Sequence, residues 1–264
     1  MDPPAGARGF QTSGDEYDRF MGRYSRPLAR TFVDFVGITE GQTVLDVGCG
    51  PGALTGELVD RLGAAAVSAC DPSEPFVADC ALRHPGVDVR LGRAEDIPFG
   101  DDTFDVALAQ LVLHFVSDPA HAAREFRRVL RPGGLAGACV WDFNEGMQML
   151  RAFWDAALTI DPNAEDEART MRFGGAGEIA ELLAEAGFTD VVETTLSVSS
   201  TYADFDELWA GVLLGIGPAG SYCVSLTDAD RARLRAALVE RLGAPSGTFS
   251  LSASARAASG RLPA

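Results

Sequence analysis

The stretch Thr43-Val44-Leu45-Asp46-Val47-Gly48-Cys49-Gly50-Pro51-Gly52-Ala53-Leu54 decides the fold of this chain. A short apolar segment carries one carboxylate and runs into three glycines at alternate positions, ahead of a helical pattern. Glycine permits backbone angles and close approaches that a side chain forbids, and the N–H groups at a helix N-terminus face a ligand. The pattern predicts a strand, a tight turn and a helix that hold a nucleoside cofactor.

Short apolar strands and helical patterns alternate over the first 141 residues. The predicted strands span 43–47, 65–70, 87–91, 104–110 and 134–141, and the predicted helices span 53–62, 74–84 and 118–130. Such alternation is typical of a doubly wound α/β sheet with right-handed crossovers. Ligands of such sheets bind beyond the carboxyl ends of the strands, so we expect the site residues to follow the strands.

The remaining segments supply helices and two further strands. Residues 1–14 are polar and rich in glycine and proline, which predicts disorder, and 15–36 read as helix divided in two at Pro27. Beyond residue 141 we predict helices at 145–160, 176–187, 203–216 and 228–242, and strands at 191–198 and 248–255. The two helices over 203–242 are expected to form a helical cap over one edge of the crevice.

Composition limits the partners of the chain. It has 264 residues and a formal net charge of −16, a sign that disfavours nucleic acid and anionic membranes. Its five cysteines have no metal-ligand spacing, so we expect free thiols, no metal and a reducing compartment. No signal peptide or 18-residue apolar span is evident. We therefore expect a cytoplasmic protein without a membrane span, and its oligomeric state stays open.

Two carboxylates end the first two strands. Asp46 stands before the glycine turn, and Asp71 follows 25 positions later, where a carboxylate can accept both hydroxyls of a ribose. Plain structural roles are also open to them, as a turn cap and a helix N-cap. The spacing Gly48-x-Gly50-x-x-Ala53 also fits the dinucleotide pattern of nicotinamide oxidoreductases. Asp46 weighs against that alternative, because a carboxylate repels a pyrophosphate and suits a cation.

Four motifs in order resemble the class I S-adenosylmethionine-dependent methyltransferases. They cover Val44–Gly52, Arg93–Val106, Leu113–Pro119 and Phe126–Gly134. The nearest resemblance is to the small-molecule enzymes of the ubiquinone/menaquinone-biosynthesis-like group. It implies a Rossmann-like sheet of seven strands, the last antiparallel, with N-terminal helices. Arg93 departs from the family, which usually has an acidic residue there, and Phe115 stands where the family often has histidine.

The resemblance also implies a cofactor, S-adenosylmethionine, and the residues around it. The glycine turn would run under its methionine and ribose, Asp46 would accept from its amino group, and Asp71 would hold the ribose. Tyr17 and Arg23 are candidates to close over its carboxylate. The full set of expected cofactor residues is Tyr17, Arg23, Asp46, Gly48, Cys49, Gly50, Gly52, Asp71, Pro72, Ala94, Glu95 and Gln110, with the pair 94–95 beside the adenine and Gln110 at the methionine end.

The acceptor side of the chain is less defined. His114 is a candidate general base, although a lone histidine beside Phe115 is more often structural. We expect a single domain over 15–264, with a cofactor-binding core at about 37–141 and substrate-side insertions at about 142–175 and 200–246. The acidic run over 161–167 is predicted to be a solvated loop. The expected activity is methyl transfer to a small apolar or aromatic molecule, and a non-catalytic cofactor-binding protein is a second alternative.

Overall fold

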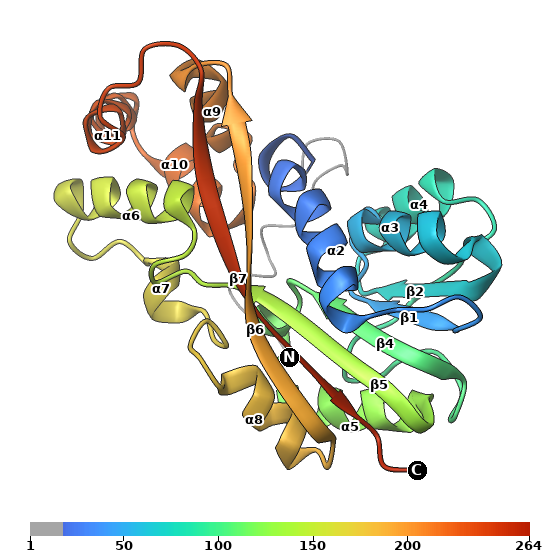
Figure 1. Ribbon diagram of the computed structural model, residues 1–264. Helices are drawn as coiled ribbons and strands as arrows, with labels where there is room; N and C mark the ends of the chain where they lie inside the picture. The colour runs from blue at the N-terminus through green and yellow to red at the C-terminus, as the bar shows by residue number, and fades with distance from the viewer. Residues whose placement is uncertain (1–17) are drawn as a thin grey trace.

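Seven strands form one mixed sheet in the computed structural model, which describes residues 18–264 (Figure 1). Their order is β3-β2-β1-β4-β5-β7-β6. The strands are β1 (Val44–Val47), β2 (Val67–Asp71), β3 (Asp88–Leu91), β4 (Phe104–Gln110), β5 (Leu130–Trp141), β6 (Thr189–Tyr202) and β7 (Phe249–Arg261). The first five are parallel and β7 pairs antiparallel with both its neighbours. The predicted fold class is therefore confirmed.

Helices cover the sheet and set its two hydrophobic cores. They are α2 (Arg23–Val36), α3 (Ala53–Leu62), α4 (Glu74–Arg83), α5 (Pro119–Val129), α6 (Gln148–Ile160), α7 (Glu167–Thr170), α8 (Glu178–Glu185), α9 (Phe205–Val212), α10 (Gly217–Ser225) and α11 (Asp228–Arg241). One core joins the sheet to α2, α3 and α6, and the other joins it to α5 and α8. Central strands such as β4 are buried on both faces, as parallel strands are.

The β6–β7 pair reaches past the rest of the sheet. β5 pairs with β7 only as far as Trp141 and Ala255, whereas the pairing of β6 with β7 continues to Tyr202 and Phe249. This two-stranded arm carries α9, α10 and α11 at its far end (Figure 1). Both strands are longer than their predicted spans, because serines and threonines hide the apolar alternation that the burial pattern of β6 reveals.

The prediction that Pro27 divides the N-terminal helix was wrong. Pro27 lies inside one continuous helix, α2, which follows a π-helical turn, η2 (Asp18–Gly22). A proline removes its own N–H bond and crowds the carbonyl four residues earlier, which here belongs to Arg23. The change of hydrogen-bond pattern therefore falls at the junction of η2 and α2 rather than at the proline.

Two further expectations concern the cysteines and membrane spans. All five cysteines are free and buried. Between residues 18 and 264, no single helix is long and apolar enough to cross a bilayer, and α9 with α10 meets that length and composition only as a pair bent by 88°. The N-terminal segment predicted to be disordered, residues 1–14, lies outside the described residues.

Candidate functional site

The glycine turn between β1 and α3 has the backbone that its sequence requires. Gly48, Gly50 and Gly52 have φ angles of +74°, +53° and +96°, a region that residues with a Cβ enter at a cost. The N–H groups of Gly48 and Cys49 both donate to the carbonyl oxygen of Cys70 on β2 (2.7 and 3.0 Å). A Cβ on Gly50 would meet nothing within 4 Å, so the turn is open at its centre.

Asp46 is buried beneath this turn with one oxygen unpaired. Its side chain is 1% exposed, and Oδ2 accepts a hydrogen bond from the Thr55 hydroxyl on α3 (2.6 Å). Oδ1 has no partner among the described residues. Burial raises the pKa of Asp46 to about 7, although the Thr55 hydrogen bond lowers it. A buried, unpaired carboxylate oxygen is costly, and a cationic hydrogen-bond donor would compensate it.

Asp71 lies at the end of β2 and is held by the backbone. Its Oδ2 accepts from the N–H of Gly50 and its Oδ1 from the N–H of Ser73, both at 2.9 Å. Burial raises its pKa, although these two hydrogen bonds lower it. The glycine turn follows Asp46 in the chain, and its Gly50 N–H is hydrogen-bonded to Asp71. The turn therefore connects the two predicted carboxylates. Each oxygen keeps a lone pair for a further donor.

Gln110 and Ser25 add two more unpaired atoms at the same edge of the sheet. Gln110 ends β4, next to β1, and its Nε2 donates to the carbonyl oxygen of Ser25 on α2 (2.9 Å). Its Oε1 and the Ser25 hydroxyl are buried without partners in the part of the chain that the structure describes. Ser25 was not predicted, because only the packing of α2 across the sheet brings it here.

The other predicted cofactor residues follow the ends of β1, β2 and β3. Cys49 is buried in the turn against Cys80, Pro72 is exposed after β2, and Ala94 is buried beyond β3. The Glu95 side chain accepts from the N–H groups of residues 117 and 118 (2.9 and 3.4 Å). It therefore ties the loop after β3 to the start of α5.

Tyr17 and Arg23 were expected to close over the cofactor carboxylate, and the structure describes only Arg23. Tyr17 lies outside the described residues. Arg23 donates to Glu207 of α9 (2.7 Å) and to the Thr201 carbonyl oxygen (3.0 Å), and its guanidinium stacks over Tyr202 at 3.9 Å. These contacts tie Arg23 to the β6–β7 arm rather than to the glycine turn.

His84 is closer to the site than the sequence indicated. We expected a solvated residue there from its place before Pro85, but its ring packs against the glycine turn. Nε2 lies 3.0 Å from the carbonyl oxygen of Gly52, and a Cβ on Gly52 would lie 2.6 Å from the same nitrogen. Burial lowers the pKa of His84, although the Gly52 hydrogen bond raises it. The His84 ring, at the end of α4, therefore packs against Gly52 and holds the glycine turn in place.

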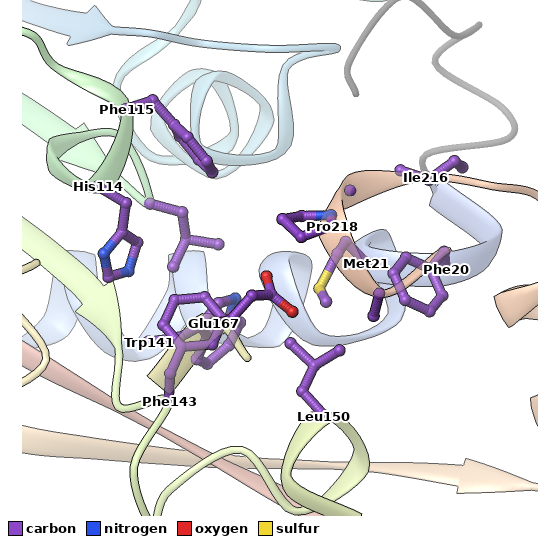
Figure 2. A pocket seen from close by; sticks show the side chains of 13 residues that line it. Phe20, Met21, His114, Phe115, Trp141, Phe143, Leu150, Glu167, Ile216 and Pro218 are labelled. Atoms are coloured by element: carbon purple, nitrogen blue, oxygen red, sulfur yellow. The ribbon is translucent and has the colours of Figure 1, made fainter. Parts of the chain in front are cut away.

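A small apolar cavity of about 50 Å³ lies beyond the ends of β4 and β5 (Figure 2). Leu111, which follows Gln110, lines it and has a φ of +63°, a conformation that a branched residue adopts only under strain. Such strain is often stored beside functional sites. The other lining residues are Phe20, Met21, His114, Phe115, Trp141, Phe143, Leu150, Glu167, Ile216, Gly217, Pro218 and Ala219.

His114 reaches this cavity from the turn η4 (Leu113–Phe115), which follows β4. Its Nδ1 lies 2.6 Å from the carbonyl oxygen of Arg172, so Nδ1 carries the proton and Nε2 is an acceptor. Nε2 is buried without a partner among the described residues. Burial lowers the pKa of His114 to about 4, so the ring is neutral at pH 7.

Glu167 is a cavity residue that the sequence did not indicate. We expected the run 161–167 to be solvated, which is wrong for three of its positions, because Ala164, Asp166 and Glu167 are 5%, 3% and 4% exposed. Oε2 of Glu167 accepts from Nε1 of Trp154 on α6 (2.8 Å). No local signal marks this inward turn, since the partners lie on another helix.

No group of three or more metal-ligating side chains is found between residues 18 and 264. The polar groups at the site that accept hydrogen bonds are two carboxylates, the amide oxygen of Gln110 and a histidine nitrogen. Such a set suits an organic ligand with ammonium and hydroxyl donors.

Comparison with known proteins decides the family. A family model described as a methyltransferase domain matches residues 45–137. The nocamycin O-methyltransferase of Saccharothrix syringae is 34% identical over 203 residues, which cover 67% of this chain and 72% of that protein. The chain belongs to the class I S-adenosylmethionine-dependent methyltransferases. S-Adenosylmethionine is therefore the cofactor of this methyltransferase, and the resemblance in the four motifs is confirmed.

A second relative is an uncharacterised 37.1 kDa protein of transposon TN4556 from Streptomyces fradiae. It is 32% identical over 194 residues, which cover 68% of the methyltransferase and 52% of that protein, so the chain spans about half of its length. Among solved structures, a protein described as a methyltransferase of an antibiotic biosynthesis pathway in Anabaena variabilis superimposes with a TM-score of 0.62. At 18% identity, with 88% of this chain and 96% of that chain covered, this likeness shows the fold alone.

Proposed function

We propose that this methyltransferase acts in the cytoplasm on a small-molecule acceptor that binds in the cavity beside Leu111. The proposal depends on the buried Asp46 beneath an open glycine turn, together with an apolar cavity that begins at Leu111, next to Gln110, and holds two buried polar groups. Those two groups are His114 and Glu167. The first feature suits a cationic methyl donor, and the second suits a small acceptor.

The unpaired atoms fit S-adenosylmethionine. We assign the unpaired oxygens of Asp46 and Gln110 to its ammonium group, and the carboxylate of Asp71 to its ribose hydroxyls. The open face of Gly50 would let the ligand approach the backbone. The pair Ala94 and Glu95 would border the adenine, with Cys49 and Pro72 at the flanks.

The carboxylate of the cofactor needs a cation. Arg23 is our candidate, with Tyr17, and it would have to exchange its hydrogen bond to Glu207 for this role. A dinucleotide would meet the site less well, since Asp46 repels a pyrophosphate. The charge of Asp46 and the family membership both favour S-adenosylmethionine over a nicotinamide cofactor.

The reaction needs no covalent intermediate with the enzyme, so the main task of the chain is to position the two reactants. The cofactor supplies a sulfonium-bound methyl group that an acceptor nucleophile displaces in line. The chain would hold the acceptor about 3–3.5 Å from that carbon and keep water out with the aromatic lining of the cavity. α10 and η2 close the cavity from the side of the helical cap, which supports a role of this cap in acceptor binding.

The acceptor is proposed to be small, and apolar or aromatic. The net charge of −16 disfavours a nucleic acid, and the lining side chains are largely aromatic and aliphatic. The relative from Saccharothrix is an O-methyltransferase by name, which supports a small natural product as acceptor. His114 offers one acceptor nitrogen, Nε2, to the bound molecule, and its low pKa makes it a weak base.

The proposal is tested by calorimetry and by transfer of a labelled methyl group. S-Adenosylmethionine and S-adenosylhomocysteine should bind with micromolar affinity and NADH should not. Only the first two carry an ammonium group that can donate a hydrogen bond to Asp46. Label from S-adenosylmethionine should then appear in at least one compound of a small-molecule extract. Binding without any transfer would favour a non-catalytic cofactor-binding protein, and binding of NADH alone would overturn the proposal.

A further inference from the structure

Glu167 stands out in the acceptor cavity because it is a buried carboxylate without a countercharge. Figure 2 shows its oxygens directed to the centre of the cavity, which Met21, Leu150 and Pro218 also line. Within the described residues, no salt bridge reaches it. Trp154 donates to one oxygen, Oε2, which fixes the carboxylate and leaves the second oxygen for a ligand.

The neighbouring charges do not neutralise Glu167. Asp166 is bound by both terminal nitrogens of Arg151 (3.2 and 2.8 Å), and it also caps α7 by accepting from the N–H of Ala168 (3.0 Å). That cation is therefore committed to Asp166. The only other titratable side chain on the cavity wall is His114, within the residues that the structure describes, and it is neutral at pH 7.

Burial also sets the basicity of Glu167. Removal from water raises the pKa of Glu167 to about 7, although the Trp154 hydrogen bond lowers it, and the charge of Asp166 raises it further. A general base works best when its pKa lies near the working pH. At neutral pH, Glu167 is a stronger base than His114, whose pKa is about 4.

We propose that Glu167 is the catalytic base of this enzyme and that the acceptor is a small phenolic compound whose hydroxyl is the nucleophile. The hydroxyl would donate to the free oxygen of Glu167 and lie against Trp141 and Phe143. This inference rests on the proposed function, since it assigns the acceptor chemistry of the same site.

The proposed step balances in atoms and charge. As the hydroxyl oxygen forms its bond to the methyl carbon, the bond from that carbon to sulfur breaks and its electron pair stays on sulfur. The hydroxyl proton passes to Glu167, which becomes a neutral carboxylic acid. Solvent removes this proton after the products leave.

A hydroxyl fits the cavity better than an amine. An alkylammonium would form a buried ion pair with Glu167, and that pairing would lower the pKa of the carboxyl and raise that of the amine. The protonated amine has no lone pair for the attack, so the ion pair would stabilise the unreactive state. A neutral hydroxyl forms no such pair, and its proton is lost only as the new bond forms.

The first test needs no acceptor and follows tryptophan fluorescence between pH 5 and 9. Because Trp154 donates to Glu167, the wild-type signal should titrate with a midpoint near 7. In an Asp46→Asn background, which removes the other buried carboxyl with a pKa of about 7, Glu167→Gln should abolish this titration, and Glu165→Gln, a matched change at an exposed position of the same loop, should keep it. The same titration in Glu167→Gln as in the Asp46→Asn parent would overturn the assignment.

The second test uses a panel of monocyclic phenols and their benzylamine counterparts, with labelled S-adenosylmethionine. For the phenols, kcat/KM should rise with pH up to about 7, and Glu167→Gln should lower it by at least about 100-fold and remove this pH dependence. Glu165→Gln should match the wild type. Transfer to the amines alone, transfer to no phenol, or an unchanged pH profile in Glu167→Gln would overturn the inference.

Binding of S-adenosylhomocysteine separates this inference from the proposed function. Glu167→Gln should bind it within about twofold of the wild-type Kd, because Glu167 lies outside the glycine turn. If the wild-type protein does not bind it, the proposed function fails. If binding is normal and the two tests of Glu167 fail, only the base assignment falls.

Discussion

Replacing Asp46 by asparagine should stabilise the free protein at pH 8 and weaken its binding of the cofactor. Burial raises the pKa of Asp46 from 3.8 to about 7, so the folded protein binds this proton more tightly than the unfolded chain. The contribution of Asp46 to stability is therefore greatest below pH 4 and is lost as the pH rises through 7. At 1.36 kcal/mol for each pKa unit, that loss is about 4 kcal/mol.

Asparagine has the same shape and carries no charge to desolvate. Its side-chain amide keeps an oxygen for the Thr55 hydroxyl but leaves one buried N–H group unpaired, which costs about 1–3 kcal/mol. Asp46→Asn should therefore be about 1–3 kcal/mol more stable than the wild type at pH 8, and this advantage should disappear at pH 4. Urea denaturation at both pH values measures the difference.

Cofactor affinity should change in the opposite direction. A hydrogen bond to a charged group is worth about 1.5–3 kcal/mol, so Asp46→Asn should raise the Kd of S-adenosylmethionine about 10- to 150-fold in calorimetry. Asp105→Asn is the matched control at the other end of the sheet. Partial burial raises the pKa of Asp105, but hydrogen bonds from Thr43 and Arg131 outweigh it and hold the pKa below its ordinary value.

The control should therefore lose stability at pH 8 and bind the cofactor like the wild type. The reasoning is refuted if Asp46→Asn binds S-adenosylmethionine with the wild-type Kd. It is also refuted if Asp46→Asn is less stable than the wild type at pH 8, since the carboxylate would then stabilise the fold.

Three further changes test the packing of the site and its ribose contact. Gly48→Ala places a Cβ 2.5 Å from Val112 at a φ of +74°, so it should lower the free energy of unfolding by about 1–3 kcal/mol, and adding Val112→Ala should restore part of it in urea denaturation. Arg151→Met leaves Asp166, which is 3% exposed, as an unpaired buried charge. It should cost about 3 kcal/mol in urea denaturation at pH 8, and an unchanged stability would exclude a contribution of this ion pair. Asp71→Asn should weaken S-adenosylhomocysteine binding by about 1–3 kcal/mol in calorimetry, and an unchanged Kd would remove its ribose role.

The parts of the fold that the sequence predicted are those with a local cause. The glycine turn needs positive φ angles at three alternate positions, and only glycine adopts them readily, so the pattern marked both the turn and the strand before it. Asp46 and Asp71 follow from the ends of neighbouring parallel strands. The last strand was predicted from the alternation over 248–255, and only its antiparallel direction came from the family resemblance.

The parts that the sequence did not predict depend on contacts between distant segments. Glu167 lies in an acidic run, and only Trp154 of another helix and the Asp166–Arg151 pair explain why it turns inward. The sequence predicted a solvated His84, but the end of α4 places its ring against Gly52. Periodicity and composition report neither kind of contact, since both are set by how helices pack on the sheet.

A crystal structure of the complex with S-adenosylhomocysteine tests the central claim most directly. The amino group of the ligand should lie within about 3.2 Å of Asp46 Oδ1, with the ribose hydroxyls on Asp71 and the sulfur facing the cavity that contains Glu167. Density for the ligand in any other cleft, or an Asp46 that remains unpaired beside the bound ligand, would contradict the account.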